Sequence, residues 1–462
     1  MKNNEHYTYM VRCEDHSLYT GYTNDIKRRL NMHVHGKGAK YTRARRPVQL
    51  VYLQKYLQKS TAMREEARIK ALTKRQKEAI CTQAIWISEC LEMDNAAISN
   101  VYIAREAQIG IELVKWYREK HRDLPWRHTN DPYAIWLSEI MAQQTRVSTV
   151  IPYYHAFLDA FPTVGALANA EEETVLKKWE GLGYYSRARN LHKAAKQIAD
   201  RYDGHLPDQK KELATLAGIG EYTAAAIASI AFHRPEPAVD GNVLRVCARM
   251  EAMEEDIALP ATKRKAAEII RPWIPVEAAG DFTQSLMELG AVVCLPKSTD
   301  CNACPVQAFC QAYAQGVQLD LPIKRAAKKT KTVFRVVALI QAPEGKWLIR
   351  RRSEALLHGL WEFPGWDCQE ETAEAKMERE LKHLNLAIDS WQAIGPARHV
   401  FSHIIWKMQG VWVRSKSSVD IDGYEWVSEA ELQQKPWPTA LATYKAWVEA
   451  IGRSPEKSKD FG

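Results

Sequence analysis

The spacing of apolar residues changes twice along the chain and separates regions of different predicted structure. Near the N-terminus, apolar and polar residues alternate with the period of two that is typical of short strands. In the middle of the chain the apolar spacing predicts helices, one of them Ala-rich. After residue 333 the pattern typical of strands returns. The predicted elements are strands at 7–13, 18–23 and 48–56, helices at 26–35, 61–72, 133–145, 210–216 and 222–231, and then further strands around a helix at 372–384.

These regions predict a multidomain α+β protein. At ~150 residues per domain, 462 residues suffice for about three domains. The segments we expect are a small α/β domain at 1–80, a connector at 81–104, an all-α domain at 105–311, a linker at 312–332, an α+β domain at 333–450 and a disordered tail at 451–462.

Composition and charge narrow the class of protein. Hydrophobic residues make up 46% of the chain, yet no apolar run approaches the ~18 residues of a membrane span. The polar N-terminus lacks a signal-peptide profile, so we expect a cytoplasmic protein without a membrane partner. Residues 1–80 hold 18 Lys and Arg against 7 Asp and Glu, whereas the remainder is slightly acidic. The first region therefore suits a polyanion such as nucleic acid, although a solvated basic surface has the same composition.

A Gly-x-Gly turn between two predicted helices organises the middle region. Gly218-Ile219-Gly220 can expose backbone N–H groups at the start of an Ala-rich helix, where a phosphate binds favourably. Asp240 follows in the segment AVDGNVLRV, close enough along the chain to act on the sugar attached to that phosphate. Most Gly-x-Gly turns are only turns, so this pattern gains its meaning from the aspartate that follows.

Two further segments carry candidate chemistry in the middle region. Glu139 is the single acid among apolar residues of a predicted helix, and a carboxyl in such surroundings retains its proton more readily. An exposed helix carboxylate is the alternative. In GLGYYSRARN, two glycines form a turn that presents Tyr184 and Tyr185, and an aromatic side chain at a loop tip can enter a base stack. Core tyrosines after a glycine turn are the more common case.

Four of the nine cysteines cluster with the spacing C-x6-C-x2-C-x5-C. They are Cys294, Cys301, Cys304 and Cys310. Four thiols this close predict a bound metal centre, and both zinc and a [4Fe-4S] cluster fit the spacing.

The N-terminal region gathers residues that can cut a phosphodiester. Tyrosine or a nearby water attacks, arginine neutralises the phosphate, and a glutamate holds a divalent metal. The candidates are Tyr9, Tyr19, Arg29, His33 and Glu66. With Tyr7-Thr8-Tyr9, Tyr19-Thr20-Gly21 and the following GKGAKYTRARRP, the region resembles a GIY-YIG nuclease domain, which implies this site and a Mg²⁺ ion.

The middle and C-terminal regions are similar to MutY-type adenine DNA glycosylases of the helix-hairpin-helix superfamily. The matching pieces are the LSE of Glu139, QQT, GLGYY, the hairpin and VDGN, all in family order. The resemblance implies that Glu139 protonates adenine and that Asp240 stabilises the sugar cation, with Tyr222 and Asn242 as support. It implies a [4Fe-4S] cluster on the four cysteines. Its implied substrate contacts are Trp126, Arg127 and Gln284 at adenine, and Gln144 and Tyr184 at the opposite strand.

The last region begins a Nudix-like box with GLWEFPG, and Gly365, Glu371, Arg379 and Glu380 stand at the box spacings. His383 and Leu384 replace two metal-binding acids, so we expect a Nudix-like fold without its hydrolase activity. In the resembled family this domain recognises 8-oxoguanine. Its contact loop corresponds to Phe401, Ser402 and His403.

We therefore expect a monomeric base-excision enzyme that acts at the nucleoid on double-stranded DNA with adenine opposite 8-oxoguanine or guanine. An endonuclease III-like enzyme that also cuts the strand is one alternative. That relative carries a lysine where this chain has Tyr222. A non-catalytic iron–sulfur protein that senses DNA damage is another alternative, and a principal activity in the N-terminal domain is a third.

Overall fold

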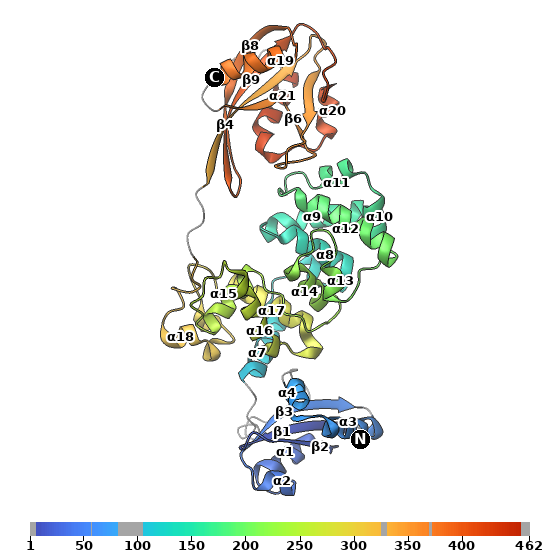
Figure 1. The fold of residues 1–462 in the computed structure, drawn as a ribbon, viewed down its shortest axis with the longest axis vertical. Helices are drawn as coiled ribbons and strands as arrows, with labels where there is room; N and C mark the ends of the chain where they lie inside the picture. Colours follow the sequence, from blue (N-terminus) through green and yellow to red (C-terminus); the bar gives the residue numbers. More distant parts are fainter. Residues whose placement is uncertain (1–5, 57, 82–104, 325–329, 369–371, 454–462) are drawn as a thin grey trace. The chain divides into compact units, whose positions relative to one another are not determined.

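The computed structural model describes the chain except residues 1–5, 57, 82–104, 325–329, 369–371 and 454–462 (Figure 1). The chain forms two compact units, Met1–Glu139 with Leu206–Arg325, and Ile140–His205 with Ala326–Gly462. The sequence prediction treats 105–311 as one helical domain, whereas these units divide it after Glu139 and again after His205. Most of the predicted connector, and most of the predicted tail, lie outside the described residues. None of the described helices has the length and apolar character needed to cross a membrane.

The N-terminal domain is a three-stranded antiparallel sheet with helices around it. Its strand order is β2-β1-β3, and Tyr9 pairs with Gly21 while Val11 pairs with Tyr19. Asp25 accepts a hydrogen bond from the Arg28 amide and so begins the basic helix α1. The elements are β1 His6–Cys13, β2 Leu18–Thr23, α1 Ile26–Val34, α2 Lys40–Arg43, β3 Val48–Tyr56, α3 Lys59–Ala71 and α4 Lys74–Cys81.

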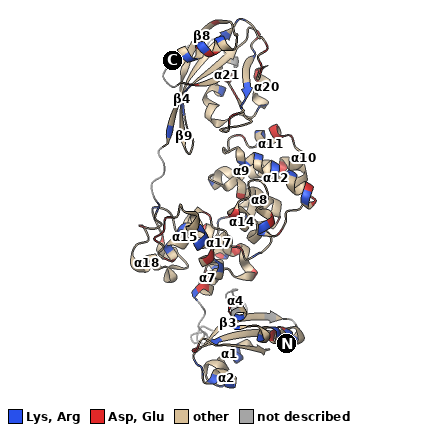
Figure 2. Ribbon diagram, in the orientation of Figure 1, with Lys and Arg blue, Asp and Glu red and all other residues tan. Residues whose placement is uncertain are grey.

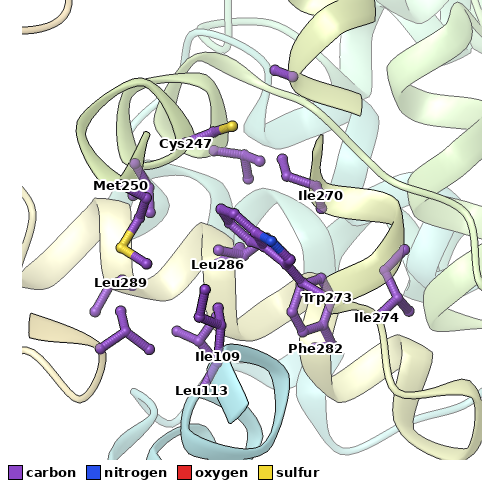
Figure 3. Packing of buried hydrophobic residues seen from close by; sticks show 14 of the residues in the cluster. Ile109, Leu113, Cys247, Met250, Ile270, Trp273, Ile274, Phe282, Leu286 and Leu289 are labelled. Atoms are coloured by element: carbon purple, nitrogen blue, oxygen red, sulfur yellow. The ribbon is translucent and has the colours of Figure 1, made fainter. Parts of the chain in front are cut away.

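The helical part of the first unit is built around one apolar core. Side chains from α7, α15, α16 and α17 converge on Trp273, with Phe282 and Leu286 beside it (Figure 3). Burial of such a cluster stabilises the unit and fixes two elements that carry candidate site residues, α15 and α17. The elements are α7 Arg105–Lys120, α8 Pro132–Ala142, α13 Lys210–Leu213, α14 Glu221–Ile230, α15 Gly241–Met250, α16 Pro260–Ile270, α17 Ala279–Val292 and α18 Gln311–Gln315, with short 3₁₀ turns between them.

The second unit joins a helical segment to the C-terminal domain. Its helices are α9 Val147–Ala160, α10 Val164–Asn169, α11 Glu172–Lys178 and α12 Ser186–Tyr202. Hydrogen bonds connect the two parts: the Tyr185 hydroxyl donates to the Trp437 carbonyl at 2.8 Å, and Lys177 donates to the Gln433 carbonyl at 2.6 Å. Glu173 accepts from the Trp361 indole at 2.9 Å.

The C-terminal domain has a mixed seven-stranded sheet with apolar side chains buried on both faces. The main strand order is β10-β5-β4-β9-β8, and β4 and β9 are parallel while the other pairs are antiparallel. The elements are β4 Lys331–Gln341, β5 Trp347–Arg351, β6 Trp361–Glu362, β7 Gly365–Cys368, α19 Ala373–His383, β8 Ile388–Val400, β9 Ile404–Ser415, β10 Tyr424–Val427, α20 Glu429–Gln434 and α21 Ala442–Arg453. Because α18 begins at Gln311 and β4 at Lys331, regular structure extends into both ends of the predicted linker.

Candidate active sites and cysteine centre

The carboxyl group of Glu139 lies near the end of α8 and receives a hydrogen bond from the Tyr222 hydroxyl at 2.7 Å. Tyr222 stands in the first turn of α14, directly after the Gly-x-Gly turn. Burial raises the pKa of Glu139 to about 7, the Tyr222 hydrogen bond opposes that rise, and the charge of Asp240 adds to it. The side chain that the sequence predicts to retain its proton is therefore about half protonated at neutral pH.

Asp240 is the N-cap residue of α15, and its carboxylate accepts a hydrogen bond from the Val243 amide at 2.7 Å. Burial raises the pKa of Asp240, while the amides of Val243 and Asn242 and the positive end of the helix favour its charged form. Its charge acts on both Glu139 and Tyr222, so the three groups form one electrostatic cluster. The Asn242 side-chain oxygen accepts from Arg245 at 2.9 Å.

The turn before α14 has the geometry that the glycines predict. Gly218 has a φ of +73°, a backbone conformation that glycine adopts at little cost. Gly220 caps α14, and no atom lies within 4 Å of the position where a Cβ would stand. The first turn of α14 is consequently open to a ligand that approaches the backbone closely.

A cavity of about 50 Å³ opens beside the Glu139 carboxyl. Trp126, Arg127 and Gln284, which the family resemblance implies as adenine contacts, all line it together with Glu139. Asp240 does not contribute to its lining.

Glu288 holds the cavity residue Arg127 in place. No sequence signal pointed to Glu288. The Glu288 carboxylate is fully buried and accepts hydrogen bonds from Arg127 at 2.5 Å and from the Arg122 guanidinium at 2.7 and 2.8 Å. Burial alone would raise the pKa of Glu288, but the two guanidinium groups lower it to about 2. The positive charge of Arg127 at the cavity is thus balanced by a buried carboxylate.

A second, larger cavity of about 330 Å³ lies within the second unit. Phe401, Ser402 and His403 line one part of it, and Tyr184 lines another. The sequence suggested these residues separately, and the fold brings them together. Tyr184 remains 46% exposed and, like Gln144, has a positive φ that is uncommon for a residue with a side chain.

Arg187 fixes the two loops that carry Gln144 and Tyr184. Its buried guanidinium donates to the Met141 carbonyl at 2.9 Å, at the end of α8, and to the Gly183 carbonyl at 3.1 Å in the glycine turn. It also donates to the Gln143 carbonyl at 2.6 Å. No sequence pattern pointed to Arg187, because the carbonyls of Met141 and Gln143 that it binds are distant in the chain.

The four clustered cysteines line one small cavity between α15, α17 and the loop before α18. Arg249 donates to the Cys294 sulfur at 3.2 Å and to the Leu295 carbonyl at 2.8 Å, so a buried cation faces the thiols. Burial raises the pKa of Cys304 to about 12, a strong penalty on a bare thiolate. Among the residues that the structure describes, no three His, Cys, Asp or Glu side chains stand close enough to hold a single metal ion.

In the N-terminal domain, four of the five predicted nuclease residues form one cluster. The Tyr9 hydroxyl lies 2.8 Å from His33 Nε2 and accepts from Arg29 Nε at 2.8 Å. Thr42 donates to the Ala39 carbonyl, and its oxygen lies 2.7 Å from His33 Nδ1. This pattern assigns the proton to Nδ1 and leaves Nε2 to accept from Tyr9. Burial, helped by Arg29, lowers the pKa of His33 to about 4, which agrees with a neutral ring.

The two phenols of this cluster, Tyr9 and Tyr19, differ in their exposure to solvent. Tyr9 is fully buried, and burial raises its pKa to about 12. Tyr19 is only half-buried, contacts the His33 ring, and hydrogen-bonds Arg29. Tyr19 is thus the phenol that can meet a substrate, and Tyr9 holds Arg29 in position.

Glu66 lies on α3, near enough to Tyr9 to act on it through its charge. Its carboxylate pairs with Lys70, one turn later, at 2.8 Å. Gly21 of the second triplet is packed so tightly that an added Cβ would stand 2.5 Å from the Tyr9 oxygen.

Of the two glutamates at the Nudix-like box spacings, the structure describes Glu380, on α19. Glu380 is paired with Lys376 at 2.9 Å and lies near Arg379. Glu371 falls outside the described residues.

Comparison with protein families assigns each region. Residues 137–273 match the HhH-GPD superfamily of base excision DNA repair proteins, residues 336–446 match a NUDIX domain, and residues 5–79 match a GIY-YIG catalytic domain. The three parts of the predicted fold are confirmed by these matches. A solved thermostable thymine-DNA glycosylase is 26% identical, with a TM-score of 0.42, and matches 46% of this chain and 97% of its own.

Curated relatives match most of the chain. The adenine DNA glycosylase of Rattus norvegicus is 32% identical and covers 71% of this chain and 75% of its own length. The human enzyme is 30% identical and covers 75% of this chain and 76% of its own length. That of Schizosaccharomyces pombe is 30% identical over 76% of this chain and 91% of its own length. The chain therefore belongs to the adenine DNA glycosylase family.

Proposed function

We propose that the protein hydrolyses the N-glycosidic bond of adenine in double-stranded DNA. The observation that carries this proposal is the cluster of Glu139, Tyr222 and Asp240, in which one carboxyl holds a proton near pH 7 and the other caps a helix. Breaking a glycosidic bond requires both a proton donor for the leaving base and an anion that faces the developing sugar cation. Family membership and the lining of the cavity by Trp126 and Gln284 support adenine as that base.

In the proposed reaction, each of these three groups has one role. Glu139 donates its proton to a ring nitrogen of adenine as the bond to the sugar breaks. Asp240, favoured as an anion by its helix, stabilises the oxocarbenium-like sugar. The Tyr222 hydroxyl stays on one Glu139 oxygen and stabilises the carboxylate that remains, which then takes a proton from the water that adds to the sugar. The cavity has room for only a few water molecules, so its wall must move to accept a base swung out of the duplex.

The experiment is release of free adenine from a duplex with adenine opposite 8-oxoguanine. Glu139→Gln removes the proton donor and should slow release by about 10²–10⁴-fold. Glu112→Gln is the matched control, because Glu112 is an exposed acid on α7. Unchanged release by Glu139→Gln would refute the assignment.

We propose that the larger cavity reads the base opposite adenine. Ser402 offers both a donor and an acceptor, and Phe401 and Tyr184 offer apolar faces that suit a planar base. An oxidised guanine differs from guanine by polar atoms, so Ser402→Ala should reduce the preference for 8-oxoguanine over guanine. Equal preference in wild type and variant would exclude the role.

We propose that the four cysteines hold a [4Fe-4S] cluster, which would supply a rigid anchor for the surrounding loop. The four thiols line one cavity, and the Arg249 guanidinium donates to the Cys294 sulfur. This arrangement and the membership of the chain in the adenine DNA glycosylase family support the [4Fe-4S] cluster over zinc. Iron and sulfide analysis of protein purified without oxygen tests this, and zinc alone would contradict it.

For the N-terminal domain we propose phosphodiester hydrolysis as a second function. The specific observation is Arg29, a cation fixed by Tyr9 next to the accessible Tyr19. Arg29 can neutralise a phosphate and Tyr19 can orient the attacking water. Glu66 is the carboxylate that could hold a divalent cation once it parts from Lys70. Magnesium-dependent nicking that Arg29→Ala abolishes is the expected result.

A further inference from the structure

We propose that the N-terminal site cuts the strand at the abasic position that the helical domain produces. This inference rests on both proposed functions and names the substrate of the second. It starts from the chemistry of the product: loss of adenine leaves a sugar without a base in a strand that is still continuous. A reaction that breaks a phosphodiester must follow before the strand can be repaired.

The helical site does not supply that second reaction. Strand cleavage by elimination needs an amine that forms an imine with the sugar, as lysine amines do with carbonyl carbons. The residue at the start of the hairpin helix is instead Tyr222, whose hydroxyl is occupied by Glu139. Burial raises its pKa well above the ordinary value, so it stays a neutral phenol. Among the described residues that line the cavity, none is a lysine.

The N-terminal site has the groups for cleavage by hydrolysis, which needs no amine. One water adds to phosphorus, the bond from phosphorus to a sugar oxygen breaks, and that oxygen leaves as a hydroxyl while a proton passes to solvent. Arg29 and a divalent cation balance the charge that develops on the phosphate. No oxidant or reductant takes part.

The charge of this domain also fits a substrate without a base. Residues 1–80 carry a balance of +11. Lys and Arg residues on α1, on α2 and in the loop after it are exposed, and Figure 2 marks Lys and Arg positions in blue along the ribbon. Such a surface binds the phosphate backbone without reading bases, so by itself it selects no position. The covalent link supplies the selection, because the helical domain brings the nuclease to the site of the excised adenine at high local concentration.

The experiment uses the full chain with Mg²⁺ and two labelled duplexes that differ at one position. One carries a tetrahydrofuran abasic analogue, which cannot undergo elimination, and the other carries the intact nucleotide. We expect nicks next to the analogue at least tenfold faster than at the same position of the intact duplex. Arg29→Ala and Tyr19→Phe should remove these nicks. Arg64→Ala, which deletes an exposed arginine from α3 and not from the basic surface of α1 and α2, should retain them.

The outcomes separate the proposals. Equal nicking of the two duplexes would leave the nuclease function standing and overturn its assignment to abasic sites. No nicking of either duplex by a protein that releases adenine would overturn both the nuclease function and this inference. Because the analogue needs no glycosylase, a failure to release adenine would bear only on the first function. Circular dichroism of Tyr19→Phe checks that its loss of cutting is not a loss of fold.

A mixing test examines the covalent link. Glu139→Gln retains the nuclease site and Arg29→Ala retains the glycosylase site, so a mixture holds both activities on separate chains. On a duplex with adenine opposite 8-oxoguanine, wild type at nanomolar concentration should nick at least tenfold faster than the mixture. Equal rates at every concentration would show that the link contributes nothing.

Discussion

The two candidate sites each place a phenol near a carboxylate, but they differ in what surrounds the acid. Glu139 is half-buried with Tyr222 as its hydrogen-bond partner, and burial raises its pKa to about 7. Glu66 is also half-buried but pairs with Lys70. An acid without a cation partner can give up a proton to a leaving base, whereas an acid with a cation partner can exchange that partner for a metal ion. We propose that the partner of each acid, more than the residue type, fits Glu139 to proton transfer and Glu66 to charge balance.

The largest effect should follow from breaking the charge balance behind the buried site. Glu288→Gln would leave the guanidinium groups of Arg122 and Arg127 without their carboxylate. Removing one partner of a buried ion pair typically costs 3–5 kcal/mol, so the urea midpoint of the helical domain should fall markedly. Glu268→Gln, an exposed acid on α16, is the control and should unfold like wild type. Identical midpoints for the two variants would show that Arg127 does not depend on Glu288.

A smaller but more specific effect is that adenine release and nicking should depend differently on pH. The proposed active form of Glu139 is protonated, and Glu139 loses its proton as the pH rises through about 7. Adenine release should therefore fall about fiftyfold from pH 7 to pH 9, because the protonated fraction falls from about one half to about 1%. His33, with a pKa lowered to about 4 by burial and Arg29, is neutral over this whole range. Nicking of the abasic duplex should show no such decline, and a parallel decline of both single-turnover rates would contradict the contrast.

The buried site also shows what the sequence could and could not predict. The apolar neighbours of Glu139 indicated a raised pKa, because a helix that is apolar on every side is buried. Its partners Tyr222 and Asp240 required the family resemblance, since they lie 83 and more residues away.

Arg187 and Glu288 were missed for a physical reason. Arg187 binds carbonyls 44 to 47 residues earlier in the chain, and Glu288 binds arginines 161 and 166 residues away. No local pattern reveals which charged residue is buried by such distant contacts. The spacing of the cysteines, in contrast, was sufficient to group them because the four lie within 17 residues.

The third prediction concerns the packing of the Tyr9 ring and affects only the N-terminal site. Gly21→Ala would place a Cβ 2.5 Å from the Tyr9 oxygen, so the ring must move and release Arg29. Overpacking of this kind costs about 1–3 kcal/mol, and nicking should fall while adenine release remains unchanged. Gly165→Ala is the steric control, because its added Cβ would stand 3.8 Å from the Thr163 hydroxyl oxygen, at an ordinary van der Waals distance. Normal nicking by Gly21→Ala would mean that the position of Tyr9 is not critical.

The smallest effect concerns the ion pair that distinguishes Glu66 from Glu139. Lys70→Ala frees the half-buried Glu66 carboxylate, and a helix pair four residues apart is worth about 0.3–0.5 kcal/mol. Stability should therefore hardly change, but the Mg²⁺ concentration for half-maximal nicking should fall about twofold, because the metal no longer competes with the lysine. Arg64→Ala removes an exposed charge from the same helix and controls for the general loss of positive charge. If both variants shift the Mg²⁺ dependence equally, the lysine acts only through the overall field, and Glu66 is not the metal-binding carboxylate.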